Sequence, residues 1–342
     1  MNTVNSTAVR QGGVASISAV HPDVFQFHIL ARLDGPSLAS LACVSSQLHA
    51  LSTEDHLWRN ICSSTWPSVN HPRVHQIIST FPSGHHSFFS DSFPFPDSRP
   101  SKLDVNSSTL PTELIFAVDV YYQNEIIYSK LEEVDTSSSW YLCSPFRFDL
   151  LDPKDCASIA IKCSNGSEDD TWLKQKEENL SLSLIVIDPT RKRAVNMSSR
   201  RAVSVQRHWL TGDVHMRFGT VLSGDKRRGS AREWVECGVV VTCCGKEGGE
   251  MQVREVSMVM EDMEGKGLNG KDSLVILGGI IGEGRKKKER DGSEGKVKYK
   301  EFQERKRERK EEKQRKERLL DLVCITVGVA GFLTFWSAIL FK

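Results

Sequence analysis

The 342-residue chain lacks the features that usually mark secreted, metal-binding and nucleic-acid-binding proteins. Its first residues contain no apolar run of the kind that a secretory signal peptide needs. The 9 cysteines are scattered without a Cys-x-x-Cys pair, which predicts neither a zinc site nor a disulfide framework. The net charge is only +1, so no excess of positive charge favours nucleic acid as a partner. We therefore expect reduced thiols, a cytosolic location for the folded parts, and no metal or other cofactor.

The sequence also offers no nucleophile that is paired with a base at a usable spacing. Asp119, Asp149 and Asp188 lie in or at the ends of predicted strands, where carboxylates more often form turns. The glycine clusters at 265–267 and 278–284 do not open a helix after a strand, so turns explain them better than phosphate loops do. We therefore expect no enzymatic activity. A membrane-bound hydrolase is the least favoured function, behind a non-catalytic receptor and a binding or scaffold protein.

A series of short helices is predicted between residues 18 and 66. Pro22 can occupy the first turn of a helix, because the N–H there has no hydrogen-bond partner anyway. Apolar residues then recur at helical spacing, and Asp34-Gly35-Pro36 ends one helix and starts the next. A serine at 45 or 46 and Thr53 can cap two further helices. Helices this few and short bury little surface, so we expect the unit to keep an apolar face for a partner.

The order and spacing of these apolar residues resemble the F-box family. The family pattern opens with a hydrophobic residue and proline, continues with Ile-Leu, two residues and Leu, and closes on Leu-Trp-basic. The chain departs from it at His21, where the family usually has leucine. The residues that the resemblance assigns to adaptor binding are Pro22, Val24, Phe25, Ile29, Leu30, Leu33, Leu38, Leu41, Val44, Leu48, Leu57 and Trp58.

The resemblance implies a role in protein ubiquitination. It implies that the helical unit docks on a SKP-family adaptor and, through it, on a cullin-RING ubiquitin ligase. The chain would then be a non-catalytic substrate receptor of an SCF-type complex, which raises the local concentration of an unknown protein substrate. The alternative is a membrane-tethered β-domain binding or scaffold protein whose F-box acts outside a ubiquitin ligase. The combination of an F-box, a β domain and an anchor resembles one branch of the plant F-box superfamily.

The middle of the chain changes from a linker to a β-rich domain. Residues 67–111 are rich in Ser, Pro and Phe, and we expect no regular structure from 82 to 111 and a turn or two of helix at 74–81. Their dense aromatic residues predict that the linker lies against the next domain. Residues 112–284 predict an all-β sandwich or barrel that binds the substrate. The expected strands are 113–122, 125–130, 140–151, 156–163, 180–188, 201–209, 213–222, 233–242, 252–262 and 273–281.

The last part of the chain combines a charged segment with an apolar one. Residues 285–318 hold 17 Lys and Arg against 9 Asp and Glu, and the stretch 301–318 predicts a solvated helix. Residues 319–341 are apolar except for Asp321 and are long enough to span a bilayer. The basic flank predicts a tail anchor that leaves both domains in the cytosol, on the endoplasmic reticulum or another endomembrane.

The whole sequence thus predicts a multidomain α+β chain. Its expected parts are disordered residues 1–17, a helical F-box at 18–66, a linker at 67–111, an all-β sandwich-like domain at 112–284, a charged linker and helix at 285–318, and a single transmembrane helix at 319–341.

Overall fold

The computed structural model describes residues 21–93, 95–96, 110–151, 157–162, 177–224, 230–244, 250–283, 286–287 and 293–341. The predicted disorder of residues 1–17 lies outside the described residues. The chain divides into two compact units, Met1–Thr65 and Trp66–Lys342. The predicted order of a helical unit, a β-rich unit and a long C-terminal helix is confirmed.

The first unit consists of short helices. They are α1 (Pro22–Val24), the π-helical turn η2 (Phe25–Ile29), the 3₁₀ turn η3 (Leu30–Arg32), α2 (Gly35–Leu41), α3 (Ser46–Ser52) and α4 (Asp55–Thr65). Ser45 caps α3 as predicted, since its side chain accepts a hydrogen bond from the Leu48 N–H at 3.2 Å. The expected cap of α4 is wrong, because the Thr53 hydroxyl donates to the His49 carbonyl at 3.0 Å and so closes α3.

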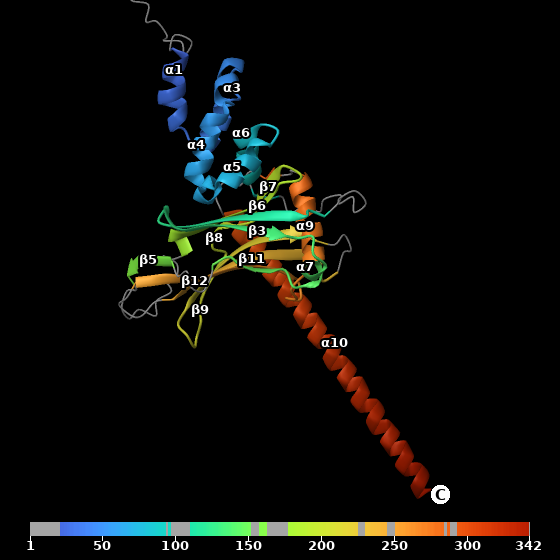
Figure 1. Cartoon of the computed structure of the whole chain (residues 1–342). Helices are drawn as coiled ribbons and strands as arrows, with labels where there is room; N and C mark the ends of the chain where they lie inside the picture. The colour runs from blue at the N-terminus through green and yellow to red at the C-terminus, as the bar shows by residue number, and fades with distance from the viewer. Residues whose placement is uncertain are drawn as a thin grey trace, which may run out of the picture. The chain divides into compact units, whose positions relative to one another are not determined.

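Two antiparallel sheets form the centre of the second unit (Figure 1). The five-stranded sheet has the order β3 (Glu125–Asp135), β2 (Glu113–Tyr122), β6 (Leu180–Asp188), β7 (Arg193–Asn196), with β8 (Arg200–Arg201) also paired to β6. The six-stranded sheet has the order β4 (Arg147–Asp149), β12 (Glu250–Asp262), β11 (Trp234–Cys244), β10 (Val214–Ser223), β9 (Ser204–Arg207), with β5 (Ala157–Lys162) also paired to β12. The short strands β1 (Phe95–Pro96) and β13 (Lys286–Lys287) pair with each other. The predicted sandwich is therefore present.

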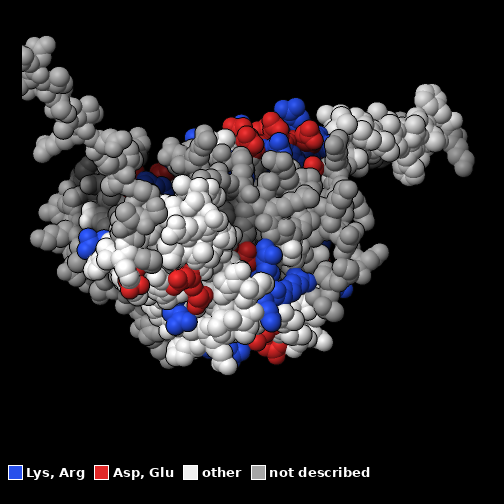
Figure 2. Space-filling model, turned by 90° about the horizontal axis from the view of Figure 1, so that it is seen from above, with Lys and Arg blue, Asp and Glu red and all other residues white. Residues whose placement is uncertain are grey.

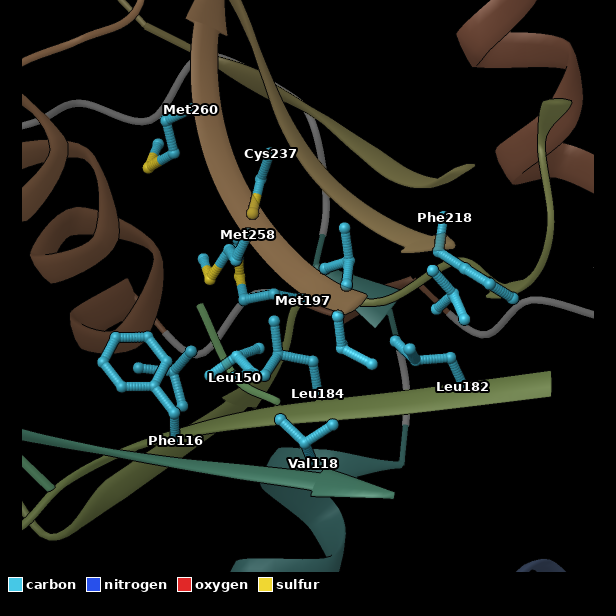
Figure 3. Packing of buried hydrophobic residues seen from close by; sticks show 14 of the residues in the cluster. Phe116, Val118, Leu150, Leu182, Leu184, Met197, Phe218, Cys237, Met258 and Met260 are labelled. Atoms are coloured by element: carbon cyan, nitrogen blue, oxygen red, sulfur yellow. The ribbon is translucent and has the colours of Figure 1, made fainter. Parts of the chain in front are cut away.

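An apolar core fills the space between the two sheets. Alternate residues of β2 and β6, such as Phe116 and Leu184, point into it from one sheet, and Phe218 and Met258 point into it from the other. Figure 3 shows these side chains facing one another across the core. The strand alternation read from the sequence thus identifies the faces that meet in the core.

The opposite face of the five-stranded sheet is buried as well. Ile115 and Ile185, which point away from the sandwich core, are fully buried. The turn η4 (Pro67–Asn70) packs on β2 and β3, and α6 (Gly84–Ser92) packs on β7 beside α5 (Pro72–Ser79). The expectation that the aromatic-rich linker lies against the next domain is confirmed. The expectation that residues 82–111 have no regular structure is wrong, because α6 forms within them.

Two further stretches differ from the predicted strands. Residues 140–151 begin with the helix α7 (Ser139–Cys143), and only β4 after it is a strand. The strand expected at 273–281 is wrong, because these residues lie in the helix α9 (Gly270–Glu283). Leu274, Leu277 and Ile281 enter the core at helical spacing. Gly278 is not a turn residue either, because it lies inside α9. Its carbonyl accepts a hydrogen bond from the Arg191 guanidinium at 2.9 Å, and a Cβ at this position would clash with that group.

The longest element is α10 (Ser293–Leu340). Figure 2 shows charged side chains of both signs over its charged part, next to an uncharged extension. The predicted solvated character is wrong for part of this helix, because Phe302 is buried against Val221 and Met263. The apolar second half is exposed, and within the described part of the chain α10 is the one helix that is long and apolar enough to cross a membrane.

The side chain of Asp119 holds η4 on the sheet. Its carboxylate accepts hydrogen bonds from the Ser68 N–H at 2.9 Å, the Ser68 hydroxyl at 2.6 Å and the Ser129 hydroxyl at 2.7 Å. The carboxylate is fully buried, and this burial raises its pKa. Asp119 is therefore a structural residue and not a turn former as expected.

We expect Asp119→Ala to lower the free energy of unfolding by about 3 kcal/mol, because it leaves buried donors without acceptors. Asp119→Asn should cost less, since an amide oxygen still accepts from the Ser68 N–H. Because burial raises the pKa of Asp119 in the folded state, the Asp119 carboxyl stabilises the protein at low pH, and this stabilisation is lost as the pH rises through that pKa. The stability of the wild type relative to Asp119→Asn should therefore increase as the pH falls toward 4. Urea denaturation at several pH values measures the free energy of unfolding of the wild type and of both variants. If Asp119→Ala and Asp119→Asn were equally stable, the assigned role of Asp119 as a hydrogen-bond acceptor would be contradicted.

Candidate functional site

The structure separates the predicted adaptor-binding residues into two sets. One set forms the interior of the first unit, and each of its side chains is at most 8% exposed. This buried set is Phe25, Leu30, Leu38, Leu48, Leu57 and Trp58. These residues stabilise the helical unit, so a partner reaches them only if the unit opens.

The other set is accessible. Val24, Ile29 and Val44 are 47%, 42% and 69% exposed, and Leu33 and Leu41 are half-buried. The side chain of Pro22 lies outside the described residues. Phe27, which the F-box pattern does not assign to adaptor binding, is 61% exposed as well. Its size was the available signal, since a large aromatic among apolar helix residues is typical of docking surfaces. We call Val24, Phe27, Ile29, Leu33, Leu41 and Val44 the accessible set.

A change of helix type explains why this division was not visible in the sequence. Phe25–Ile29 is a π-helical turn, followed by a 3₁₀ turn at Leu30–Arg32. A π turn aligns residues five apart instead of three or four. Phe25 and Leu30 therefore point inward together, while Val24 and Ile29 remain exposed.

Hydrogen bonds and ring contacts fix the helices that carry the accessible set. The Asp34 carboxylate accepts from the Ser37 N–H at 3.0 Å and caps α2. Hydrogen bonds from Ser37 lower the pKa of Asp34, so this cap adds stability at neutral pH and loses it in acid. The Trp58 indole donates to the Ser52 carbonyl at 2.7 Å, which ties α4 to α3.

Phe27 lies beside the start of α4. Its ring centroid is 6.2 Å from that of His56. Gln26 donates a hydrogen bond to Glu54 in the turn before α4. The π-helical turn and α4 are therefore held together, and part of the accessible set lies along their junction.

The second unit carries the other residues considered as functional. Asp188 accepts from the Thr190 and Arg191 N–H groups at 3.0 Å each and forms the predicted turn, and Asp149 pairs with Arg147. From the sequence, four tryptophans could line a groove for a ligand, although packing in the sandwich is the favoured interpretation. Trp140 and Trp209 are exposed, Trp234 lies under Arg305, and Trp172 is outside the described residues. Within the described ranges, no group of three or more His, Cys, Asp or Glu side chains is placed to hold a metal ion.

Comparisons with known proteins extend the likeness beyond the first unit. The F-box-like family model matches residues 22–64. The chain is 45% identical over 339 residues to F-box protein At2g27310 of Arabidopsis thaliana, covering 96% of this chain and 97% of that protein. It is 45% identical over 313 residues to F-box protein At3g44326 of Arabidopsis thaliana, covering 89% and 85% of the two chains.

A third relative is Probable F-box protein At2g36090 of Arabidopsis thaliana, 42% identical over 316 residues that cover 92% of this chain and 91% of that protein. No solved structure matches the chain. The relatives match across the sandwich as well as the helical unit, and the chain belongs to the F-box protein family.

Proposed function

We propose that the protein is the substrate-recognition subunit of an SCF-type ubiquitin ligase. The observation that carries this proposal is the accessible set of apolar residues on a helical unit whose own core is already filled. Large apolar side chains left in water on a packed unit mark a surface that a partner covers. In the F-box family that partner is a SKP-type adaptor, which connects to a cullin-RING ligase.

The second unit is proposed to select the substrate. It is a separate compact unit with its own core, so it can hold a protein while the first unit binds the adaptor. The receptor performs no bond chemistry in this proposal. It brings the substrate close to the ligase and raises the rate of ubiquitin transfer through local concentration.

The apolar half of α10 is proposed to anchor the protein in a membrane as a C-terminal tail. Its exposed side chains include Leu319, Val329, Phe332 and Trp336. About 20 apolar residues in a helix cross the hydrocarbon core of a bilayer. The basic residues before Leu319 favour the cytosolic side, which keeps both units where a cullin ligase can reach them.

Purification of the full-length protein from its native membrane tests the ligase assignment. We expect a SKP-family adaptor and a cullin to co-purify at comparable amounts. Recovery of the adaptor without a cullin would favour the alternative, in which the F-box acts in a membrane-tethered scaffold outside a ligase. Recovery of neither, with the first unit folded, would refute the proposal.

A further inference from the structure

The outer face of the six-stranded sheet is shaped to receive the first half of α10. Gly219 of β10 and Gly238 of β11 are direct partners in the strand register. A Cβ at Gly219 would lie only 3.3 Å from Glu236 Oε1 and would touch the Tyr299 ring of α10 at 3.5 Å, and a Cβ at Gly238 would lie 3.0 Å from the Arg217 guanidinium. The paired glycines therefore leave room for the side chains that lie between sheet and helix.

Charged groups beneath the helix connect it to three strands. Arg217 of β10 donates to the fully buried Glu236 of β11, and its Nη2 lies 3.4 Å from Glu261 of β12. Glu261 in turn lies 3.7 Å from Lys306 of α10. A buried carboxylate needs such partners, because an isolated charge is costly away from water. The helix thus completes a charge network that begins in the sheet.

Apolar and cationic contacts continue along the helix toward its exit from the sheet. Phe302 is 2% exposed and packs on Val221 and Met263. The Arg305 guanidinium lies 5.5 Å from the centre of the Trp234 ring, and Arg309 donates to the Ser230 carbonyl at 2.9 Å.

Among the described residues, the last contact between α10 and the sandwich is that of Lys313, whose Nζ lies 3.8 Å from Glu264. Nearer the start of the helix, Lys296 pairs with Glu177, so the docked part of α10 extends from Lys296 to Lys313.

The same helix continues without interruption into the apolar segment. No glycine or proline occurs between residues 296 and 327, so nothing in the sequence introduces a hinge. From Lys313 to Leu319 the helix rises about 9 Å at 1.5 Å per residue. A flexible linker would let the sandwich move in all directions, whereas a docked continuous helix does not.

We propose that α10 is a rigid strut that holds the sandwich close above the membrane, at a fixed height and in one orientation. This inference rests on the proposed membrane anchoring. The strut fixes the height at which a bound substrate is presented to the ligase, and it favours substrates whose recognised segment lies near the same membrane surface.

Hydrogen–deuterium exchange of the full-length protein in lipid nanodiscs tests the docking. Phe302→Asp should release the helix and speed exchange of the 299–313 amides at least tenfold, while β10 and β11 stay protected. Val297→Asp is the matched control, because Val297 is on the same helix and 54% exposed, and it should leave exchange unchanged. Equal exchange in the two variants would overturn the docked strut.

An insertion after Lys316 tests the fixed height. Eleven helix-forming residues lengthen a helix by about 16 Å. Energy transfer from a dye at the exposed Thr211 to dye-labelled headgroups should fall with this insertion, and a Gly-Ser insertion of equal length should give a broad distance distribution instead.

Two outcomes separate the strut from the proposed function. Unchanged transfer after the helical insertion, with normal incorporation into the bilayer, overturns the strut and leaves the anchored receptor intact. Failure of the full chain to incorporate into the bilayer overturns the anchor and the strut together, while adaptor and cullin binding remain testable separately.

Discussion

The double substitution Ile29→Ala with Val44→Asp should weaken binding of a SKP-family adaptor by about 100-fold or more. Both residues belong to the accessible set, so the change removes apolar contact and places a charge on the docking surface without opening the core. Truncation of a hot-spot residue typically costs about 2 kcal/mol or more, which is roughly thirtyfold in affinity. Titration calorimetry with the purified adaptor measures the loss, and circular dichroism checks that the helices persist.

Two control variants separate docking from folding. Leu210→Asp changes an exposed leucine of the second unit and should leave adaptor affinity unchanged. Leu30→Ala removes a fully buried side chain and should lower the stability of the first unit by about 2–5 kcal/mol. If the Ile29/Val44 variant stays helical and binds at wild-type strength, the accessible set is not the adaptor surface.

Deletion of residues 319–342 should move the protein from the membrane fraction to the soluble fraction. The segment contributes many Leu, Ile, Val and Phe residues, each worth about −0.3 to −0.6 kcal/mol for insertion near the centre of a bilayer. Asp321 opposes insertion only weakly, because it lies at the end of the segment, where it can reach the headgroups. The full-length protein should resist carbonate extraction.

Point substitutions give a sharper version of the same experiment. Val329→Arg with Phe332→Arg should mimic the deletion, since two central charges cost about 5–7 kcal/mol. Val329→Leu with Phe332→Leu is the matched control and should remain in the membrane. Protease added to intact microsomes should digest both units and leave a small protected tail. Protection of the two units instead would place them in the lumen, away from any cullin ligase.

Features that depend on neighbouring residues along the chain could be predicted from the sequence. The strands Glu113–Tyr122 and Leu180–Asp188 have the predicted bounds, because β-branched and apolar residues alternate there between clear turns. Gln123 and Asn124 form the predicted turn between β2 and β3, with positive φ at both positions. The F-box pattern was recognisable because it is a short, ordered set of residues.

Other features depend on partners that are distant in the sequence. Residues 273–281 contain enough Ile, Leu and Val to suggest a strand, but their fit into the core makes them a helix. In the candidate site, the π-helical turn decided which apolar residues stay exposed, and an assumed spacing of 3.6 residues could not show this. A fragment limited to residues 112–284 would also lack α5, α6 and α10, which cover the outer faces of the sheets.

The sequence by itself determined the helical unit, the β-rich domain and the apolar end of the chain. The first two follow from the local periodicity of apolar residues, and the third follows from an unbroken apolar run. Only the tertiary structure decided that the charged half of α10 packs on the six-stranded sheet. Phe302 is the one aromatic residue between 301 and 318, and its buried neighbour Tyr299 lies just before that stretch, so the charged stretch alone predicts a solvated helix. Its docking depends on Gly219, Gly238 and the buried Glu236, and the strand register brings these residues together.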